Sequence, residues 1–208
     1  EIARILNIPG EFQQKWELAA EKMKESILMN FWKEEYGRFF RSVRVKLNPW
    51  GNEPSANTVI VKVNPKGYKR ELTAEDSTVD VSLLGLSIPF EVLDVSDCRM
   101  RSTVDVIEKR LTNSNTGGIK RYENDNYMGG NPWILTTLWV ALYHIRTGNH
   151  DKAKEYLKWA VKSCTPLGLL PEQVGRDDGR PAWVIPLTWS HAMFVHVLSE
   201  LTDAGVVF

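Results

Sequence analysis

The chain has 208 residues, of which 43% are hydrophobic, and its ten prolines are spread along its length. This composition is typical of a globular protein with a sizeable core, or of part of a larger one, and it argues against an extended disordered chain. Twenty-six basic residues balance 26 acidic ones, so no long-range electrostatic field favours nucleic acid or a membrane surface as the partner, and a neutral ligand fits better.

The N-terminal part predicts a long helix followed by strands. Apolar residues recur at steps of three and four within residues 11–35, which is the period of an amphipathic helix. The residues of this apolar face are Phe12, Trp16, Ala19, Ala20, Met23 and Ile27. The segments 41–47 and 58–64 are rich in β-branched residues and flank a run of Pro, Gly and Asn, so they predict a small β-hairpin inserted between helices.

Five further helices are predicted along the rest of the chain. Asn131 and Pro132 form a strong start signal, because Asn caps free backbone amides and Pro fits the first helical turn. A run of turn formers with two tyrosines precedes this signal. The predicted ranges of the five helices are 78–88, 96–111, 131–147, 151–163 and 186–201.

The connections between these helices alternate in length. Those at 36–77, 112–130 and 164–184 are long, whereas the others are short. Helices joined by short turns run antiparallel, so the three long connections are expected to emerge at one end of a closed or partly closed array of helical hairpins. Binding residues concentrate on loops that a rigid scaffold positions, so this end is the predicted site.

The sequence does not favour a disulfide framework, a metal site built on cysteines, a membrane-spanning segment or a signal peptide. Cys98 and Cys164 are too few for a disulfide framework, and we expect small buried hydrophobic side chains rather than a bridge or a metal site. No apolar stretch reaches the roughly 20 residues that cross a membrane. Glu1 to Arg4 lack the basic start and apolar centre of a signal peptide. Such a signal can be removed from a mature chain, so the compartment stays open.

The long connections carry carboxylates, amides, arginines and aromatic rings, with no lysine-rich stripe. Aromatic faces cover the apolar surface of a sugar, while carboxylates and Arg form hydrogen bonds with its hydroxyls, so this set favours a neutral polyhydroxylated ligand. Glycoside hydrolysis then needs two carboxyl groups, and Glu172, within the loop "LGLLPEQVG", supplies one. The candidate side chains are Trp50, Arg121, Tyr122, Glu123, Asp125, Tyr127, Glu172, Gln173, Arg176, Asp177, Asp178 and Trp183.

Several of these residues have plainer alternatives. A surface ion pair between Arg121 and Glu123 is one, and a solvated turn at 177–179 is another. His191 and His196 lack companion metal ligands, so packing is the simpler interpretation. Ser190 beside His191 resembles a nucleophile with its base, but adjacent helical residues point in different directions, which excludes that pair.

Three further tryptophans, at 133, 139 and 159, are expected in the helices of the C-terminal half. Trp139 and Trp159 are predicted to lie in the core. Trp133 falls in the first turn of its predicted helix, next to the long connections, so a place near the ligand stays open for it.

Three phrases in this order resemble the C-terminal half of the catalytic domain of glycoside hydrolase family 15, the glucoamylases with their glucodextranase and trehalase relatives. They are "RYENDNYMGGNPWILTTLW" (121–139), "GLLPEQV" (168–174) and "PLTWSHAMF" (186–194). "DVSLLGLSIPF" (80–90) and "TVDVIEKRL" (103–111) are similar to the prokaryotic branch of that family. The resemblance covers the chain from about Val79 onward and, more loosely, from Gly10.

The resemblance implies a fold, a reaction and roles for single residues. The fold would be all-α, about half of an (α/α)6 barrel, and the reaction an exo-acting hydrolysis of α-glucosides that inverts the anomeric carbon and releases β-glucose. Glu172 matches the catalytic base, with Gln173 beside it, and Arg121 matches an arginine that binds glucose hydroxyls. Trp133 matches an aromatic residue near that pocket, and Tyr122 and Glu123 complete the predicted substrate-binding set. No cofactor or metal is implied.

One departure from the family pattern stands out. The general acid of the family lies on an aromatic-acidic motif upstream of everything seen in this chain. Residues 1–208 are therefore expected to be the C-terminal portion of a larger catalytic domain, with an α-glucan or α-glucoside oligosaccharide and the N-terminal half of the same enzyme as partners. If no upstream half exists, Glu123 or Asp125 is the nearby substitute acid, and a non-catalytic carbohydrate-binding module is the other class of function. The linkage of the substrate is not predicted.

Overall fold

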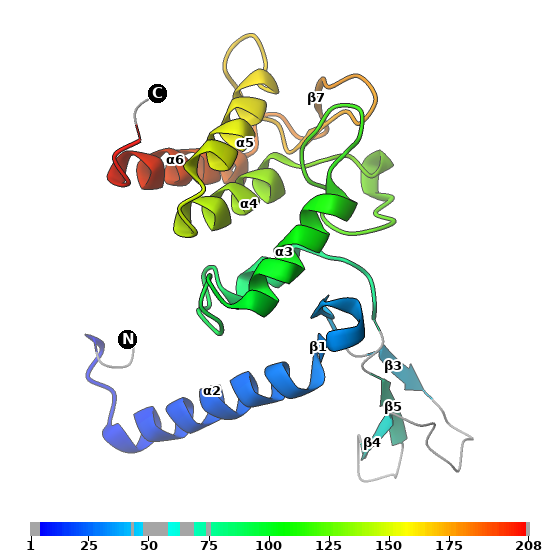
Figure 1. Ribbon diagram of the computed structural model, residues 1–208, viewed down its shortest axis with the longest axis vertical. Helices are drawn as coiled ribbons and strands as arrows, with labels where there is room; N and C mark the ends of the chain where they lie inside the picture. The colour runs from blue at the N-terminus through cyan, green and yellow to red at the C-terminus, as the bar shows by residue number, and fades with distance from the viewer. Residues whose placement is uncertain (1–4, 43, 48–57, 63–68, 74–75, 207–208) are drawn as a thin grey trace. The chain divides into compact units, whose positions relative to one another are not determined.

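The computed structural model describes residues 5–42, 44–47, 58–62, 69–73 and 76–206 (Figure 1). The chain divides into two compact units, Glu1–Asp76 and Ser77–Phe208. Helices make up most of the described residues, as the sequence predicts. None of the helices that the structure describes combines the length and the apolar character needed to cross a bilayer.

The first unit begins with helix α2, Gly10–Asn30. The predicted helix 11–35 is therefore wrong at its C-terminal end, where the chain forms the short strands β1 (Trp32–Lys33) and β2 (Arg38–Phe39) around a 3-10 turn. Gly37, at φ 58°, takes the left-handed conformation that ends this turn. The periodicity of α2 does not mark a core face, since no residue of this helix is buried.

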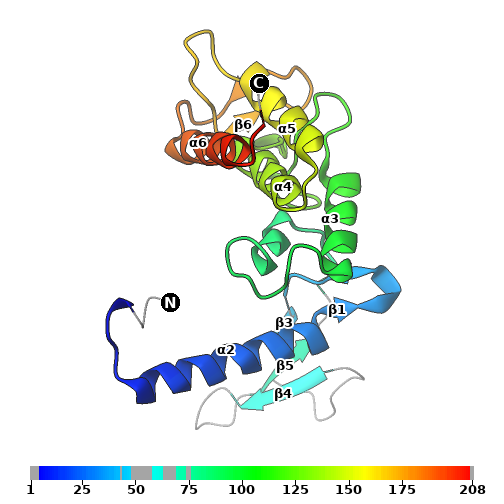
Figure 2. The same ribbon diagram turned by 60° about the vertical axis from the view of Figure 1, so that its left-hand side comes forward.

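The predicted β-hairpin is wrong in its pairing. Strands β3 (Arg44–Leu47) and β4 (Thr58–Lys62) both exist, but each pairs with a third strand, β5 (Lys69–Thr73), and not with the other. All the pairings are antiparallel, in the order β3-β5-β4 (Figure 2). The sequence conceals β5 because "KRELT" is mostly charged and lacks an apolar alternation. Parts of the predicted strands, at 43 and 63–64, lie outside the described residues.

The second unit is built around helix α4, Ile134–Arg146, in which ten of 13 residues are buried. This helix contacts α5 and α6, and Figures 1 and 2 show the three packed together. It is apolar on nearly all sides, as expected for a helix enclosed by others. The other elements in chain order are η2 (Val81–Leu86), α3 (Cys98–Leu111), η3 (Tyr127–Gly129), α5 (His150–Lys162), β6 (Gln173–Val174), β7 (Pro181–Ala182) and α6 (Thr188–Asp203).

Four of the five predicted C-terminal helices are present, and the remaining one, the first in chain order, is much shorter. The range 78–88 contains only a 3-10 helix, η2, which Asp80 begins by accepting from the backbone N–H of Ser82 at 2.8 Å. The residues before it pair with another segment instead, since Asp80 bridges to Tyr122 and Glu123 N donates to Val79 O. Helix α4 begins at Ile134 with Trp133 as its N-cap, so Asn131 does not cap it.

The predicted burial of the cysteines is also wrong. Cys98, the first residue of α3, is exposed, and Cys164 is half-buried. Both are free thiols, as predicted.

Candidate functional site

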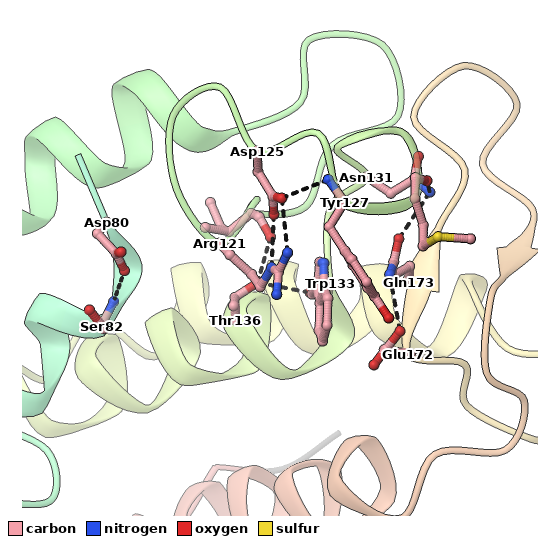
Figure 3. A network of polar contacts seen from close by, with 12 residues as sticks. Asp80, Ser82, Arg121, Asp125, Tyr127, Asn131, Trp133, Thr136, Glu172 and Gln173 are labelled. Carbon is pink, nitrogen blue, oxygen red and sulfur yellow. Dashed lines mark hydrogen bonds and ion pairs between the residues drawn. The ribbon is translucent and has the colours of Figure 1, made fainter. Parts of the chain in front are cut away.

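A strip of single β-bridges joins the two long connections of the second unit. Ile119 bridges to Trp133, and Trp133 bridges to Gln173, which continues into the β6–β7 pair. Two of the three long connections expected at one end, 112–130 and 164–184, therefore meet on either side of Trp133, next to the N-terminal end of α4. Figure 3 shows the side chains that gather above this helix.

Arg121 and Asp125 form a bidentate ion pair in the first of these connections. Arg121 Nε lies 2.8 Å from Asp125 Oδ2, and Arg121 Nη2 lies 2.9 Å from Asp125 Oδ1. Burial raises the pKa of Asp125, but hydrogen bonds from Arg121 and from the backbone N–H of Tyr127 outweigh it, and the net pKa is lowered. The carboxyl group is therefore held ionised. The predicted alternative, a surface pair between Arg121 and Glu123, is wrong.

Aromatic rings surround the guanidinium of Arg121. Its central carbon lies 4.5 Å from the ring centroid of Trp133, 4.9 Å from that of Tyr127 and 5.3 Å from that of Tyr122. Such contacts each contribute about 0.5–2 kcal/mol and fix the plane of the guanidinium. Trp133 is 6% exposed, and its indole N–H has no hydrogen-bond partner among the described residues. The arrangement holds one fixed cation beside a buried donor.

Glu172 is half-buried and lies on the neighbouring connection. Its Oε2 accepts a hydrogen bond from Gln173 Nε2 at 3.0 Å, and Gln173 Oε1 accepts from Asn131 Nδ2 at 3.1 Å. Gln173 is fully buried, so Asn131 fixes which end of its amide faces Glu172. No hydrogen bond to Glu172 Oε1 appears within the described part of the chain, so this oxygen can accept a proton. Figure 3 shows this chain of amides leading from Asn131 to Glu172.

The backbone around Glu172 is held by two neighbouring segments. Its N–H donates to Val184 O at 2.8 Å, and its carbonyl accepts from Ile134 N at 3.2 Å, the first residue of α4. The central helix α4 therefore fixes the position of the Glu172 backbone. A loop position with both backbone groups bonded is a rigid support for a functional carboxylate.

Ser190 and His191 hold the residues just before Glu172. Ser190 Oγ donates to Pro171 O at 2.7 Å, and His191 Nε2 accepts from Leu170 N at 3.0 Å. The sequence rules out a nucleophile and base here, and the structure gives both side chains another role, since they position the loop that carries Glu172.

Glu123 makes a different set of contacts from those of the site residues around it. One carboxylate oxygen accepts from Val79 N at 2.8 Å, and the other pairs with Arg110. The carboxylate therefore ties the segment before η2 to this connection. Its predicted part in binding a substrate stays a prediction, and neither oxygen is free to act as an acid in this conformation.

Of the remaining candidates, Asp177 and Asp178 lie in a turn, and Trp183 lies at the edge of this centre. Asp178 accepts from the backbone N–H of Arg180 at 3.0 Å, so 177–179 is the exposed turn that the plainer alternative describes. Trp183 contacts Tyr127 edge to face, with ring centroids 6.0 Å apart. Trp50 lies outside the described residues. Among the residues that are described, no three His, Cys, Asp or Glu side chains are placed to bind a metal ion.

The ion pair of Arg121 and Asp125 makes a prediction about stability and pH. The pKa of Asp125 is lower folded than unfolded, so its stabilising contribution is present above the unfolded value of about 3.9 and is lost as pH falls through the folded value. We expect Asp125→Asn to lower the free energy of unfolding by about 2 kcal/mol at pH 7. Chemical denaturation at pH 7 and pH 3 should show the gap between the two proteins closing in acid. A gap of equal size at both pH values contradicts the assignment.

A model of the glycosyl hydrolases of family 15 matches residues 2–199. An uncharacterized glycosyl hydrolase of Methanocaldococcus jannaschii is 40% identical over 146 residues, which are 64% of this chain and 23% of that protein. The isomaltose glucohydrolase of Kribbella flavida is 30% identical over 136 residues, which are 60% of this chain and 35% of that protein. The trehalase 1 of Sulfolobus acidocaldarius is 30% identical over 131 residues, 62% of this chain and 23% of that protein. The chain thus spans about a quarter to a third of these relatives.

Solved structures show the same fold. A crystal structure of a bacterial glucoamylase complexed with acarbose matches 99% of this chain and 31% of that chain, with a TM-score of 0.71 and 25% identity. A wild-type glycosidase matches 89% of this chain and 43% of that chain, with a TM-score of 0.66 and 21% identity. The predicted fold class, a helical array that forms part of an (α/α)6 barrel, is confirmed.

Proposed function

Because the chain belongs to the glycosyl hydrolases of family 15, we propose that it supplies one side of the active site of an inverting, exo-acting α-glucoside hydrolase. The substrate would be an α-glucan or α-glucoside oligosaccharide, and the product β-glucose from its non-reducing end. The observation that carries this proposal is the position of Glu172. Its backbone and its Oε2 are held by hydrogen bonds, while its Oε1 can accept a proton near the guanidinium of Arg121.

Glu172 would act as the general base. A carboxylate that accepts a proton from water makes that water a stronger nucleophile toward the anomeric carbon. Gln173 holds one oxygen of Glu172 at 3.0 Å, which orients the other toward the water. The loop is anchored to α4 through Ile134, so the base keeps its position as the bond breaks.

Arg121 would bind hydroxyls of the glucose unit that is cleaved. Its guanidinium uses Nε and one terminal nitrogen for Asp125, so its other terminal nitrogen keeps donors for the ligand. A fixed donor beside aromatic rings suits a neutral sugar, because the rings cover its apolar C–H surface.

The general acid would come from the part of the complete protein outside this chain. Asp125 is held ionised by Arg121, and an ionised carboxylate cannot donate a proton to the leaving oxygen. Both oxygens of Glu123 are engaged with Arg110 and Val79. These contacts disfavour both residues as substitute acids.

Exposed apolar side chains beside Glu172 support the N-terminal half of the enzyme as a partner of this chain. Beside Glu172, the segment Trp183, Val184 and Ile185 is exposed, and Trp189 on α6 is 66% exposed. Exposed large apolar side chains next to a candidate site mark a place that another element covers. In the proposed enzyme, the missing helical hairpins would cover this surface and complete the barrel.

The stereochemistry of the first product tests the function. The complete protein should release glucose from an α-linked disaccharide, and proton NMR of the fresh product should show the β anomer before mutarotation equilibrates it. Release of the α anomer would contradict an inverting reaction. Binding of the disaccharide without any release of glucose would support the alternative, a non-catalytic carbohydrate-binding module.

The role of His191 makes a further prediction. His191→Leu removes the acceptor for Leu170 N, so the loop of Glu172 should shift and kcat should fall by about 10²-fold, the effect expected of a displacement near 1 Å. His191→Gln restores an acceptor oxygen and should recover part of that loss. Initial rates of the complete protein with a disaccharide measure both. Equal losses in the two variants would mean that packing, and not the hydrogen bond, explains the effect.

A further inference from the structure

A groove with polar and aromatic residues lies on the second unit, lined by α3, α5 and the loop between residues 112 and 118. Its volume is about 500 Å³, within the range of about 300–1,000 Å³ of small-ligand sites. Tyr156 and Trp159 line it from α5, one helical turn apart. None of its residues belongs to the centre of Arg121 and Glu172, so the proposed hydrolysis does not explain it.

The indole of Trp159 is fixed by the loop beside it. Its N–H donates to Thr116 O at 2.8 Å, and the next two residues are glycines in the left-handed conformation. A Cβ on Gly118 would lie 2.2 Å from the ring atom Cζ2. Only glycine therefore allows the backbone this close to the indole. A rigid aromatic ring at the wall of a groove is a surface on which a flat ligand face can stack.

A buried polar cluster forms the floor of the groove. Tyr156 donates its hydroxyl proton to Glu108 Oε1, and His144 Nε2 lies 3.1 Å from the same oxygen in poorer alignment. Burial raises the pKa of Glu108, but the close contact with His144 and the hydrogen bond from Tyr156 outweigh it and lower the net value. Both named contacts use Oε1, so Oε2 can accept from a ligand.

The rim of the groove carries one acid and two bases. Lys109 and Glu155 are exposed, and Lys152 lies 3.2 Å from Glu155 Oε2. Together with Glu108 these side chains sum to no net formal charge, which disfavours an anionic ligand such as a phosphate. Donors and acceptors both line the groove together with aromatic rings, and that combination suits a ligand with many hydroxyls and one apolar face.

The groove is connected to the candidate active site. Thr112, Gly117 and Gly118 line its wall, and the same loop continues to Arg121. Thr112 bridges to Ile119, and Ile119 bridges to Trp133 in that site. A glucan held in the groove would thus lie on the wall of the loop that binds the unit to be cleaved.

We propose that this groove is a second carbohydrate site, which binds a glucosyl unit of an α-glucan against Trp159, with Glu108, Glu155 and Lys109 bonded to its hydroxyls. The inference rests on the proposed function for the identity of the sugar. A site of this kind raises the local concentration of a polymer, and it gives no advantage with a disaccharide.

The test uses the double variant Lys109→Ala with Glu155→Ala in the complete protein. Its matched control is Asp151→Ala with Lys158→Ala, which removes one acid and one base from the exposed surface of α5 outside the groove. Native gels that contain soluble starch or dextran measure binding, and initial rates with polymer and with disaccharide measure its consequence. In the gel that contains starch or in the one that contains dextran, the groove variant should lose most of the slowing of its migration. Its KM for the same polymer should be about five- to tenfold higher, the equivalent of one or two hydrogen bonds. Its rates with the disaccharide should not change.

The outcomes separate this inference from the proposed function. Unchanged retardation and an unchanged polymer KM in the groove variant, with disaccharide hydrolysis intact, would overturn the groove alone. No hydrolysis of any α-glucoside by the unmodified protein would overturn the proposed function, and the gels would still decide whether the groove binds a glucan. An equal loss of retardation in the control variant would show a nonspecific charge effect and contradict the site. Trp159→Phe, which keeps an aromatic face without the N–H, should retain part of the retardation.

Discussion

Replacement of Glu172 by Gln should lower kcat of the complete protein by about 10²- to 10⁴-fold, the contribution of a positioned general base. The amide is nearly the same size as the carboxylate and still accepts from Gln173 Nε2, so the loop should keep its conformation. An amide cannot take a proton from water, however, and the attacking water loses its activation. Because the lost interaction matters only in the transition state, KM should change little and kcat/KM should fall with kcat.

The control for Glu172 is Asp177→Asn on the same connection. Asp177 loses the same charge, but its side chain is 78% exposed and belongs to the turn at 177–179. The initial rates of the Asp177→Asn variant should match those of the unmodified protein. If Glu172→Gln keeps more than half of kcat, Glu172 is not the base.

A chemical rescue separates the base from a merely structural carboxylate. Glu172→Ala leaves space beside the anomeric carbon, and azide is a nucleophile that needs no deprotonation. Azide should therefore restore turnover with an activated α-glucoside and yield the β-glucosyl azide, in which the anomeric carbon is inverted. Restoration of rate with an α product would contradict attack from the side of Glu172.

The sequence predicts the helices of the second unit because their apolar periodicity reflects real burial. Ten of 13 residues of α4 are buried, and such a helix leaves a strong signal. Helix α2 carries a similar period without any buried residue, so periodicity predicts the helix but not its packing partner. The range 78–88 predicts a full helix, but only the short η2 forms there.

The convergence of the two long connections was predictable from their lengths, whereas the pairing within them was not. Arg121 is paired with Asp125 and not with Glu123 because Asn124 adopts φ 58°, which turns the chain back on itself. Left-handed residues are uncommon outside glycine, and no sequence pattern here reveals this one. A Cβ on Gly130 would lie 2.0 Å from Asp125 O, so this glycine is also required by the turn.

The sequence also concealed the residues that support Glu172. Asn131 looks like a helix cap, yet its amide fixes Gln173, and Ser190 and His191 look like a discarded catalytic pair, yet they hold the loop. Each of these contacts joins residues at least 19 positions apart. Long-range contacts of single side chains leave no local period, so only the folded structure shows them.

Arg121→Lys should have the second largest effect. Lysine keeps the charge, but a single ammonium cannot make two parallel bonds with Asp125 or lie flat between Trp133 and Tyr127. Each charged hydrogen bond that is lost contributes about 1.5–3 kcal/mol, so kcat/KM for a disaccharide should fall by at least about tenfold. In contrast to Glu172→Gln, KM should rise, because the arginine is proposed to bind the substrate in its ground state as well.

The control and the second readout distinguish binding from folding. Arg176→Lys changes an arginine whose side chain is 55% exposed and whose nearest carboxylate oxygen, on Asp177, lies 3.5 Å away, so its kinetics should not change. Arg121→Lys should also lower the unfolding midpoint, because it leaves the buried carboxylate of Asp125 poorly paired. Glucose should raise the midpoint of the unmodified protein more than that of Arg121→Lys, since at one concentration a ligand stabilises the fold more when it binds more tightly. If glucose raises both midpoints equally, Arg121 supports the loop but does not contact the sugar.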